Sequence, residues 1–225
     1  MKLPAALKAD DDTAALDLLR RYYGTSSDSE PAYTGAAFDS WDPSGTRATS
    51  ADVFTADDVV AVSLLSVRLT GRAAHELLVR RRKNFSALLA EVGPDRDLVD
   101  VEEEISTDWP ASRLLSALKH LPGVGTTTAS KLLARKRPRL RPVWDTVVAG
   151  HLEVGGSYIE PLRQQLQAHD GALHDRLVRL GRKGKLQGVS PLRVFDVVTW
   201  LEAKDAGHRA SADDEIEQSQ PGAAS

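Results

Sequence analysis

The stretch "LPGVGTTTASKLLARKRPRLRPVWDTVV" (residues 121–148) decides which fold this sequence predicts. It begins with a glycine-containing turn, continues through a densely basic segment, and ends near one carboxylate, Asp145, among apolar neighbours. Segments with apolar residues at helical spacing, "PASRLLSALK" and "TASKLLARK", lie on either side of the turn. Two amphipathic helices joined by so short a turn form a helical hairpin, which we place at residues 111–137.

The turn itself has the composition of a phosphate-binding loop. Pro122 ends the first helix, and Gly123 and Gly125 allow positive φ and leave the backbone amides unshielded. The second helix starts at once, so its free N–H groups and positive dipole end point the same way as those amides. Val124 is expected to anchor the turn in the core.

The hairpin predicts a site that contacts the DNA backbone and does not read base sequence. Its three threonines can add hydroxyl bonds or cap the second helix, and its three cations are expected to project from the outer side of that helix. A glycine-rich connection with a solvated basic face is the structural alternative. The predicted DNA-binding residues are Pro122, Gly123, Val124, Gly125, Thr126, Thr127, Thr128, Lys131, Arg135 and Lys136.

The rest of the chain predicts an all-α fold, because helical periodicity recurs and no convincing strand alternation occurs. We expect an acidic N-terminal helix and irregular segment over residues 1–54, a helical domain over 55–206, and a disordered tail over 207–225. Thr55 with Asp58 resembles a capping box before an apolar run that reaches Leu69. Ser190 and Pro191 open the last helix as N-cap and first residue.

Charge is distributed unevenly along the chain, whose formal net charge is −3. Residues 1–60 are acidic, whereas residues 111–150 hold eight basic side chains and one acid. Residues 176–193 hold six basic side chains and no acid. Local charge is what a polyanion senses, so the two basic segments favour a nucleic-acid partner despite the negative total.

Several classes of protein are not expected. The chain has no cysteine, which excludes disulfides and a cysteine-bound iron–sulfur cluster or zinc. Its six histidines lack the spacing of a metal site, so we expect no metal and no cofactor. No apolar run is long enough for a membrane span, and no signal peptide is evident, so we expect a cytoplasmic, nucleoid-associated protein.

Together, "LPGVGTTTASKLL" and "VWDTVV" resemble the helix-hairpin-helix DNA glycosylase superfamily, which includes endonuclease III and the adenine glycosylases. Members share a hairpin of the form L-P-G-[VI]-G-x-x-T-A, followed by an apolar–Asp–Thr segment. The resemblance covers residues 113–152. It implies a glycosylase-like helical domain, double-stranded DNA as partner, and a divergent bacterial branch without the iron–sulfur cluster.

The resemblance also implies a chemistry. In the superfamily the aspartate, here Asp145, stabilises positive charge on the sugar while a flipped base departs. Bifunctional members carry a lysine at the position of Thr127, so this chain would be a monofunctional DNA glycosylase of base-excision repair. Many members have histidine where this chain has Val147, and no base-recognition residue can be named.

The sequence also fits other roles for Asp145, Trp144 and the chain as a whole. Asp145 is also a good N-cap for the helix that follows, through the amides of Val147 or Val148. Trp144 suits either base stacking or the core. The chain as a whole fits a catalytic glycosylase, a non-catalytic DNA-binding or adaptor protein with the same fold, or a helical protein without nucleic acid.

Overall fold

The computed structural model describes residues 1–8, 10–24, 31, 33–154 and 158–219, with side chains described as far as Gly207. This part of the chain is helical and contains no strand, which confirms the all-α prediction. Short 3-10 turns occur at Thr34–Ala37 (η1) and Leu98–Asp100 (η3), and a π-turn occurs at Glu76–Arg80 (η2). The α-helices are α1 (Ala5–Lys8), α2 (Thr13–Tyr23), α3 (Ala56–Ser63), α4 (Gly71–His75), α5 (Arg82–Val92), α6 (Pro110–Lys119), α7 (Thr126–Lys136), α8 (Thr146–His151), α9 (Ile159–Lys183) and α10 (Pro191–Ser219).

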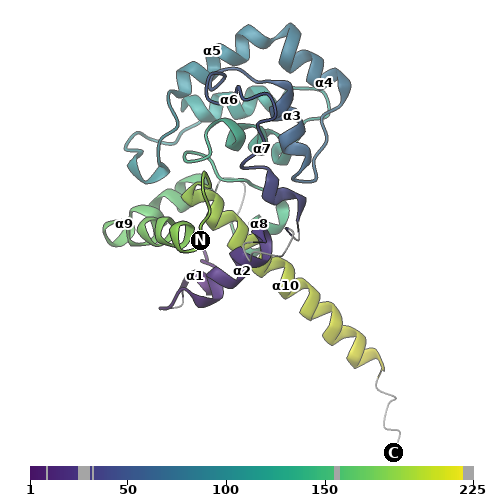
Figure 1. The fold of residues 1–225 in the computed structure, drawn as a ribbon, viewed down its shortest axis with the longest axis vertical. Coiled ribbons are helices and arrows are strands. Elements are labelled where there is room, and N and C mark those ends of the chain that lie inside the picture. Colours follow the sequence, from purple (N-terminus) through teal and green to yellow (C-terminus); the bar gives the residue numbers. More distant parts are fainter. Residues whose placement is uncertain (9, 25–30, 32, 155–157, 220–225) are drawn as a thin grey trace, which may run out of the picture.

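The helices form two groups, which are seen one above the other in Figure 1. In the upper group α6 packs against α5 and α7, and α3 packs against α7. In the lower group α10 packs against α1, α2, α8 and α9. The chain starts in the lower group, builds the upper group from α3 to α7, and returns to the lower group at α8. Segments that are distant in the sequence therefore meet where the two groups of helices contact each other.

The acidic N-terminal segment packs against the basic part of α9 and against α10. The Asp12 carboxylate binds Arg176 at 3.2 Å, Arg179 at 3.1 Å and Lys183 at 2.8 Å, all on α9. The backbone amide of Ala5 donates to Glu202 on α10 at 2.7 Å. Part of the charge of the basic segment that begins at residue 176 is therefore paired with an acid of the N-terminal segment.

Local signals in the sequence place several helix ends correctly. The capping box of Thr55 and Asp58 is present at the start of α3. Pro110 opens α6, and the Ser190 hydroxyl accepts a hydrogen bond from the Arg193 amide at 3.1 Å as α10 begins. These ends depend on contacts within a few residues, which is why the sequence predicts them.

Other helix ends differ from the prediction. The helix expected to reach Leu69 ends at Ser63, and Ser66 takes a positive φ of 61°. The reason is tertiary, because the Lys131 ammonium on α7 binds the Leu65 carbonyl at 2.8 Å just beyond the helix end. The backbone of residues 207–219, expected to be disordered, continues α10; residues 220–225, and residues 25–30 and 32 of the expected irregular segment, lie outside the described residues.

Helix α7 carries its cations inward, which corrects the expectation that they project from its outer side. Lys131, Arg135 and Lys136 are 5, 2 and 6% exposed. Arg135 and Lys136 share the buried Asp58 carboxylate of α3, at 3.2 and 2.5 Å. Arg135 also donates to the Phe38 carbonyl at 2.8 Å. Because protein oxygens already bind these buried cations, they are not free to contact a DNA backbone.

We predict that Asp58→Ala destabilises the fold strongly, since it leaves two buried cations without their carboxylate. Removing one partner of a buried ion pair typically costs about 3–5 kcal/mol. Urea unfolding followed by circular dichroism measures this change. Asp57→Ala is the matched control, because Asp57 is half-buried and bonds only Ser44 among the described residues; its loss is expected to cost about 1 kcal/mol. Equal losses for the two variants would contradict the structural role of the α7 cations.

Candidate functional site

The hairpin between α6 and α7 is formed as the sequence predicts. Gly123 has φ of 75°, a conformation that favours glycine, and Val124 is buried at 6% exposure. The Thr70 hydroxyl donates to the Pro122 carbonyl at 3.3 Å and fixes the turn against the start of α4. The turn is therefore held on both sides, by the core and by residue 70.

Gly125 plays a different part from Gly123. Its φ is −89°, so the expectation of positive φ at both glycines is wrong for this one. It is the N-cap residue of α7, and its carbonyl accepts the hydrogen bond of the Ala129 amide at 3.0 Å. The amides before Ala129 have no partner within the helix, because the first turn of any helix lacks one. Gly125 and Thr126 are exposed, so the start of α7 lies at the protein surface, whereas Thr127 is half-buried and Thr128 is buried.

Asp145 is the N-cap of α8, as the structural alternative predicted. Its Oδ1 accepts a hydrogen bond from the Val148 amide at 3.0 Å. The preceding residues are held from two sides: the Ser130 hydroxyl of α7 donates to the Trp144 carbonyl at 3.1 Å, and the Val143 amide donates to Asp196 of α10 at 2.6 Å. The carboxylate of Asp145 is thus oriented by both groups of helices.

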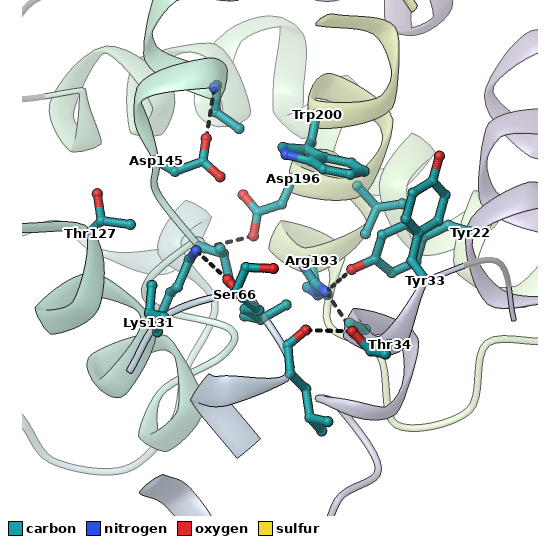
Figure 2. A pocket seen from close by; sticks show the side chains of 17 residues that line it. Tyr22, Tyr33, Thr34, Ser66, Thr127, Lys131, Asp145, Arg193, Asp196 and Trp200 are labelled. Carbon is teal, nitrogen blue, oxygen red and sulfur yellow. Dashed lines mark hydrogen bonds between the residues drawn. The ribbon is translucent and has the colours of Figure 1, made fainter. Parts of the chain in front are cut away.

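A pocket of about 240 Å³ lies beside the hairpin, where the two groups of helices meet (Figure 2). Asp145 and Thr127 are both in its lining, so the two positions that the glycosylase resemblance singles out are brought together. The rings of Tyr33 and Trp200 meet edge to face at 5.2 Å in its lining. The lining consists of Tyr22, Tyr33, Thr34, Gly35, Leu64, Leu65, Ser66, Val67, Thr127, Lys131, Val143, Asp145, Val148, Arg193, Asp196, Val197 and Trp200.

Lys131 belongs to this pocket and not to the outer surface of α7. Burial lowers the pKa of its ammonium below the ordinary value, and the nearby Asp145 carboxylate opposes that shift. Its hydrogen bond to the Leu65 carbonyl fixes the loop in which Ser66 has a positive φ. Backbone strain of this kind concentrates at binding sites, where surrounding contacts hold it.

The structure also places the aromatic candidates. Trp144 is 8% exposed and stacks on Tyr158 with ring centroids 3.6 Å apart, so the core interpretation is confirmed. Trp200, expected in the core, is half-buried and lines the pocket.

Three other cations lie close to the hairpin along the chain or next to the residue that contacts it. Arg68 and Arg72 flank Thr70, the residue that binds the turn, and Lys119 ends α6. All three side chains are exposed, and within the described residues no ion pair involves them. Sequence reasoning missed Arg68 and Arg72 because their proximity to residue 122 depends on the tertiary contact of Thr70.

Asp196, Tyr22 and Tyr33 were also missed as site residues. They come from α10, α2 and the segment after it, more than 100 residues apart at the extremes. Only the acid within the apolar run "VFDVVTW" was a signal, because a carboxyl on a buried helix face requires a partner.

A family model described as "Family of unknown function (DUF6308)" matches residues 15–203. The chain belongs to this family. The DUF6308 match covers the hairpin, Asp145 and the pocket-lining part of α10, but it assigns no activity and does not identify a helix-hairpin-helix glycosylase. The comparison with curated proteins finds no match, and the comparison with solved structures finds none either.

The described residues contain no group of three or more histidine and carboxylate side chains that could hold a metal ion. None of their helices is long and apolar enough to cross a membrane.

We predict that Asp145→Ala lowers the free energy of unfolding by about 1 kcal/mol through loss of the cap. Asp145→Asn should leave it nearly unchanged, because asparagine caps helices about as well as aspartate. Denaturant unfolding of both variants measures the difference. An Asp145→Asn variant as unstable as Asp145→Ala would show that the charge, and not the cap, stabilises α8.

Proposed function

We propose that this protein binds double-stranded DNA through the hairpin and hydrolyses the N-glycosidic bond of a base unstacked into the adjacent pocket. One observation carries the proposal. Asp145 and Thr127 line a single pocket beside the exposed start of α7.

The amides at the start of α7 suit a DNA phosphate. A helix N-terminus offers free N–H groups and the positive end of a dipole to an anion. Neither packing nor conformation requires glycine at residue 125, since a Cβ there would meet no atom within 4 Å and its φ is −89°. A glycine that the fold does not need is consistent with a phosphate that approaches the backbone closely.

The charge beside the hairpin also favours this partner. The exposed side chains of Arg68, Arg72 and Lys119 take the role that the sequence assigned to the α7 cations. Contacts of this type neutralise phosphates without regard to sequence, and they make affinity fall steeply as salt rises.

The size and walls of the pocket suit a single base. Its volume of about 240 Å³ lies below the roughly 300–1,000 Å³ typical of sites for drug-sized ligands. Aromatic side chains line it, as in enzymes that hold a flipped base between rings. The proposed reaction requires the base to occupy this pocket with its sugar next to Asp145.

The proposed reaction is hydrolysis. Water adds to C1′ of the deoxyribose as the C1′–N bond breaks; the sugar gains a hydroxyl group and the base leaves with a proton. One oxygen of Asp145 caps α8, and the second is available to stabilise positive charge on the sugar and to accept a proton from the water. Thr127 provides no amine, and the Lys131 ammonium is bound to a carbonyl, so strand cleavage is not expected.

We predict that Gly125→Asn weakens DNA binding at least tenfold without loss of stability. Asparagine at an N-cap binds the amides that we assign to phosphate, and it favours the helix. Fluorescence anisotropy with a duplex at several salt concentrations, together with thermal unfolding, measures both effects. Gly45→Asn is the control, because Gly45 lies in an exposed turn with open space around it, and asparagine is one of the residues that tolerate its positive φ of 66°. Unchanged affinity in Gly125→Asn would remove the hairpin from the interface.

We predict that Asp145→Asn binds DNA as the wild type does but loses base release by at least a hundredfold, because the pocket loses its stabilising charge. The assay incubates duplexes carrying a panel of damaged or mismatched bases with each protein and then cleaves abasic sites with alkali. The asparagine variant keeps the helix cap, so stability is its internal control. Equal release by both proteins would reduce Asp145 to a cap, and no release from any duplex by the wild type would favour a DNA-binding protein without catalysis.

A further inference from the structure

Asp196 is a buried acid in the pocket whose hydrogen bonding is incomplete. It lies on α10 with 2% of its surface exposed, and its Oδ2 accepts the Val143 amide at 2.6 Å. Its Oδ1 is buried and has no hydrogen-bond partner among the residues that the structure describes. A buried polar atom without a hydrogen-bond partner destabilises the fold, so an oxygen of this kind next to a cavity points to an occupant.

The neighbouring cation does not satisfy this acid. Arg193, one turn earlier on α10, directs its guanidinium to Asp39 at 3.1 Å, to the Tyr22 hydroxyl at 2.8 Å and to the Gly35 carbonyl at 3.1 Å. Asp196 therefore receives only a longer-range interaction from Arg193 (Figure 2).

Asp196 sits in surroundings that disfavour its charged form. Burial raises the pKa of its carboxyl well above the ordinary value, and the nearby charge of Arg193 only partly opposes this. A protonated carboxyl offers one O–H donor and one acceptor. Asp196 interacts electrostatically with titratable groups on all the elements packed around it. These groups are Arg193, Asp39, Asp145, Lys131, Tyr22 and Tyr158.

We propose that Asp196 is the specificity residue of the pocket, and that its Oδ1 hydroxyl donates a hydrogen bond to a ring nitrogen or carbonyl oxygen of a planar nucleobase. The Val143 amide binds Oδ2, which leaves that oxygen as the acceptor and Oδ1 as the donor. The lining otherwise offers mainly aromatic and aliphatic side chains such as Trp200, Tyr33 and Val197. These surfaces hold a flat ring without distinguishing one from another, so discrimination falls to the polar groups.

This inference rests on the proposed function in one respect only: the proposed function says that the base comes from DNA. Binding of a free ring needs no DNA, so the two proposals fail separately. Loss of DNA binding with intact ring binding would overturn the first, and indifference of ring binding to Asp196 would overturn the second.

The test measures the affinity of the full-length protein for purine and for indole by titration calorimetry. The two bicyclic rings have nearly the same shape, but only purine carries ring-nitrogen acceptors. Asp196→Asn keeps both a donor and an acceptor, and Asp196→Leu has neither. We expect Asp196→Asn to bind purine within about threefold of the wild type and Asp196→Leu to lose at least tenfold, about 1.4 kcal/mol. Indole affinity should stay constant in both variants, which also reports an intact pocket.

The pH dependence provides a second readout, which holds even if Asp196→Leu fails to fold. Wild-type affinity for purine should fall as pH rises through ionisation of the carboxyl, because the donor proton is lost. Affinity of Asp196→Asn should stay level over the same range, since its amide does not titrate. The assignment would be overturned if the two proteins showed parallel pH profiles or if the wild type did not bind purine. It would also be overturned if Asp196→Asn lost purine binding or if Asp196→Leu bound purine as the wild type does.

Discussion

The inward-facing cations of α7 are the constraint on which the rest of the structure depends. Arg135 and Lys136 meet at the Asp58 carboxylate, and Lys131 binds the carbonyl of Leu65. These bonds hold α3 and the loop after it against α7. Since buried charges are costly unless they are paired, the contacts strongly favour one arrangement of these elements. That arrangement leaves the start of α7 open and gives the pocket one of its walls.

The pocket forms because the C-terminal helix α10 packs against the N-terminal helix α2. Helix α2 and the segment after it supply Tyr22 and Tyr33, and α10 supplies Asp196 and Trp200. The segment before α8 joins these parts to α7, because Val143 bonds Asp196 and Trp144 bonds Ser130. The exposed start of α7, the Asp145 carboxylate and the aromatic-lined pocket thus lie next to one another. This arrangement suits the proposed unstacking of a base.

How much of this could be read from the sequence depends on the range of the interactions. The hairpin, the cap at Asp145 and the helix starts at Thr55 and Ser190 are fixed by near neighbours, and the sequence predicts them. The direction of the α7 cations is not local. A basic run on a helix normally indicates a solvated face, and here distant partners, Asp58 and the carbonyls of Phe38 and Leu65, reverse it.

The pocket was beyond sequence reasoning for a similar reason. Its lining combines residues from both ends of the chain with the middle, and no periodicity connects them. The end of α3 at Ser63 is likewise set by Lys131 from α7. The glycosylase resemblance named Asp145 and Thr127 but no base-recognition residue, and Asp196 emerges only from burial and an unfilled hydrogen bond.

The most direct test of the central claim, that DNA docks on the hairpin and delivers a base to the pocket, is a crystal structure with a duplex containing an abasic-site analogue. We expect a phosphate oxygen bonded to the amide of Gly125 or Thr126 and the analogue's sugar facing Asp145. A duplex bound on another face, such as the basic segment of residues 176–193, would contradict this expectation. So would a protein that forms no complex with the duplex at low salt.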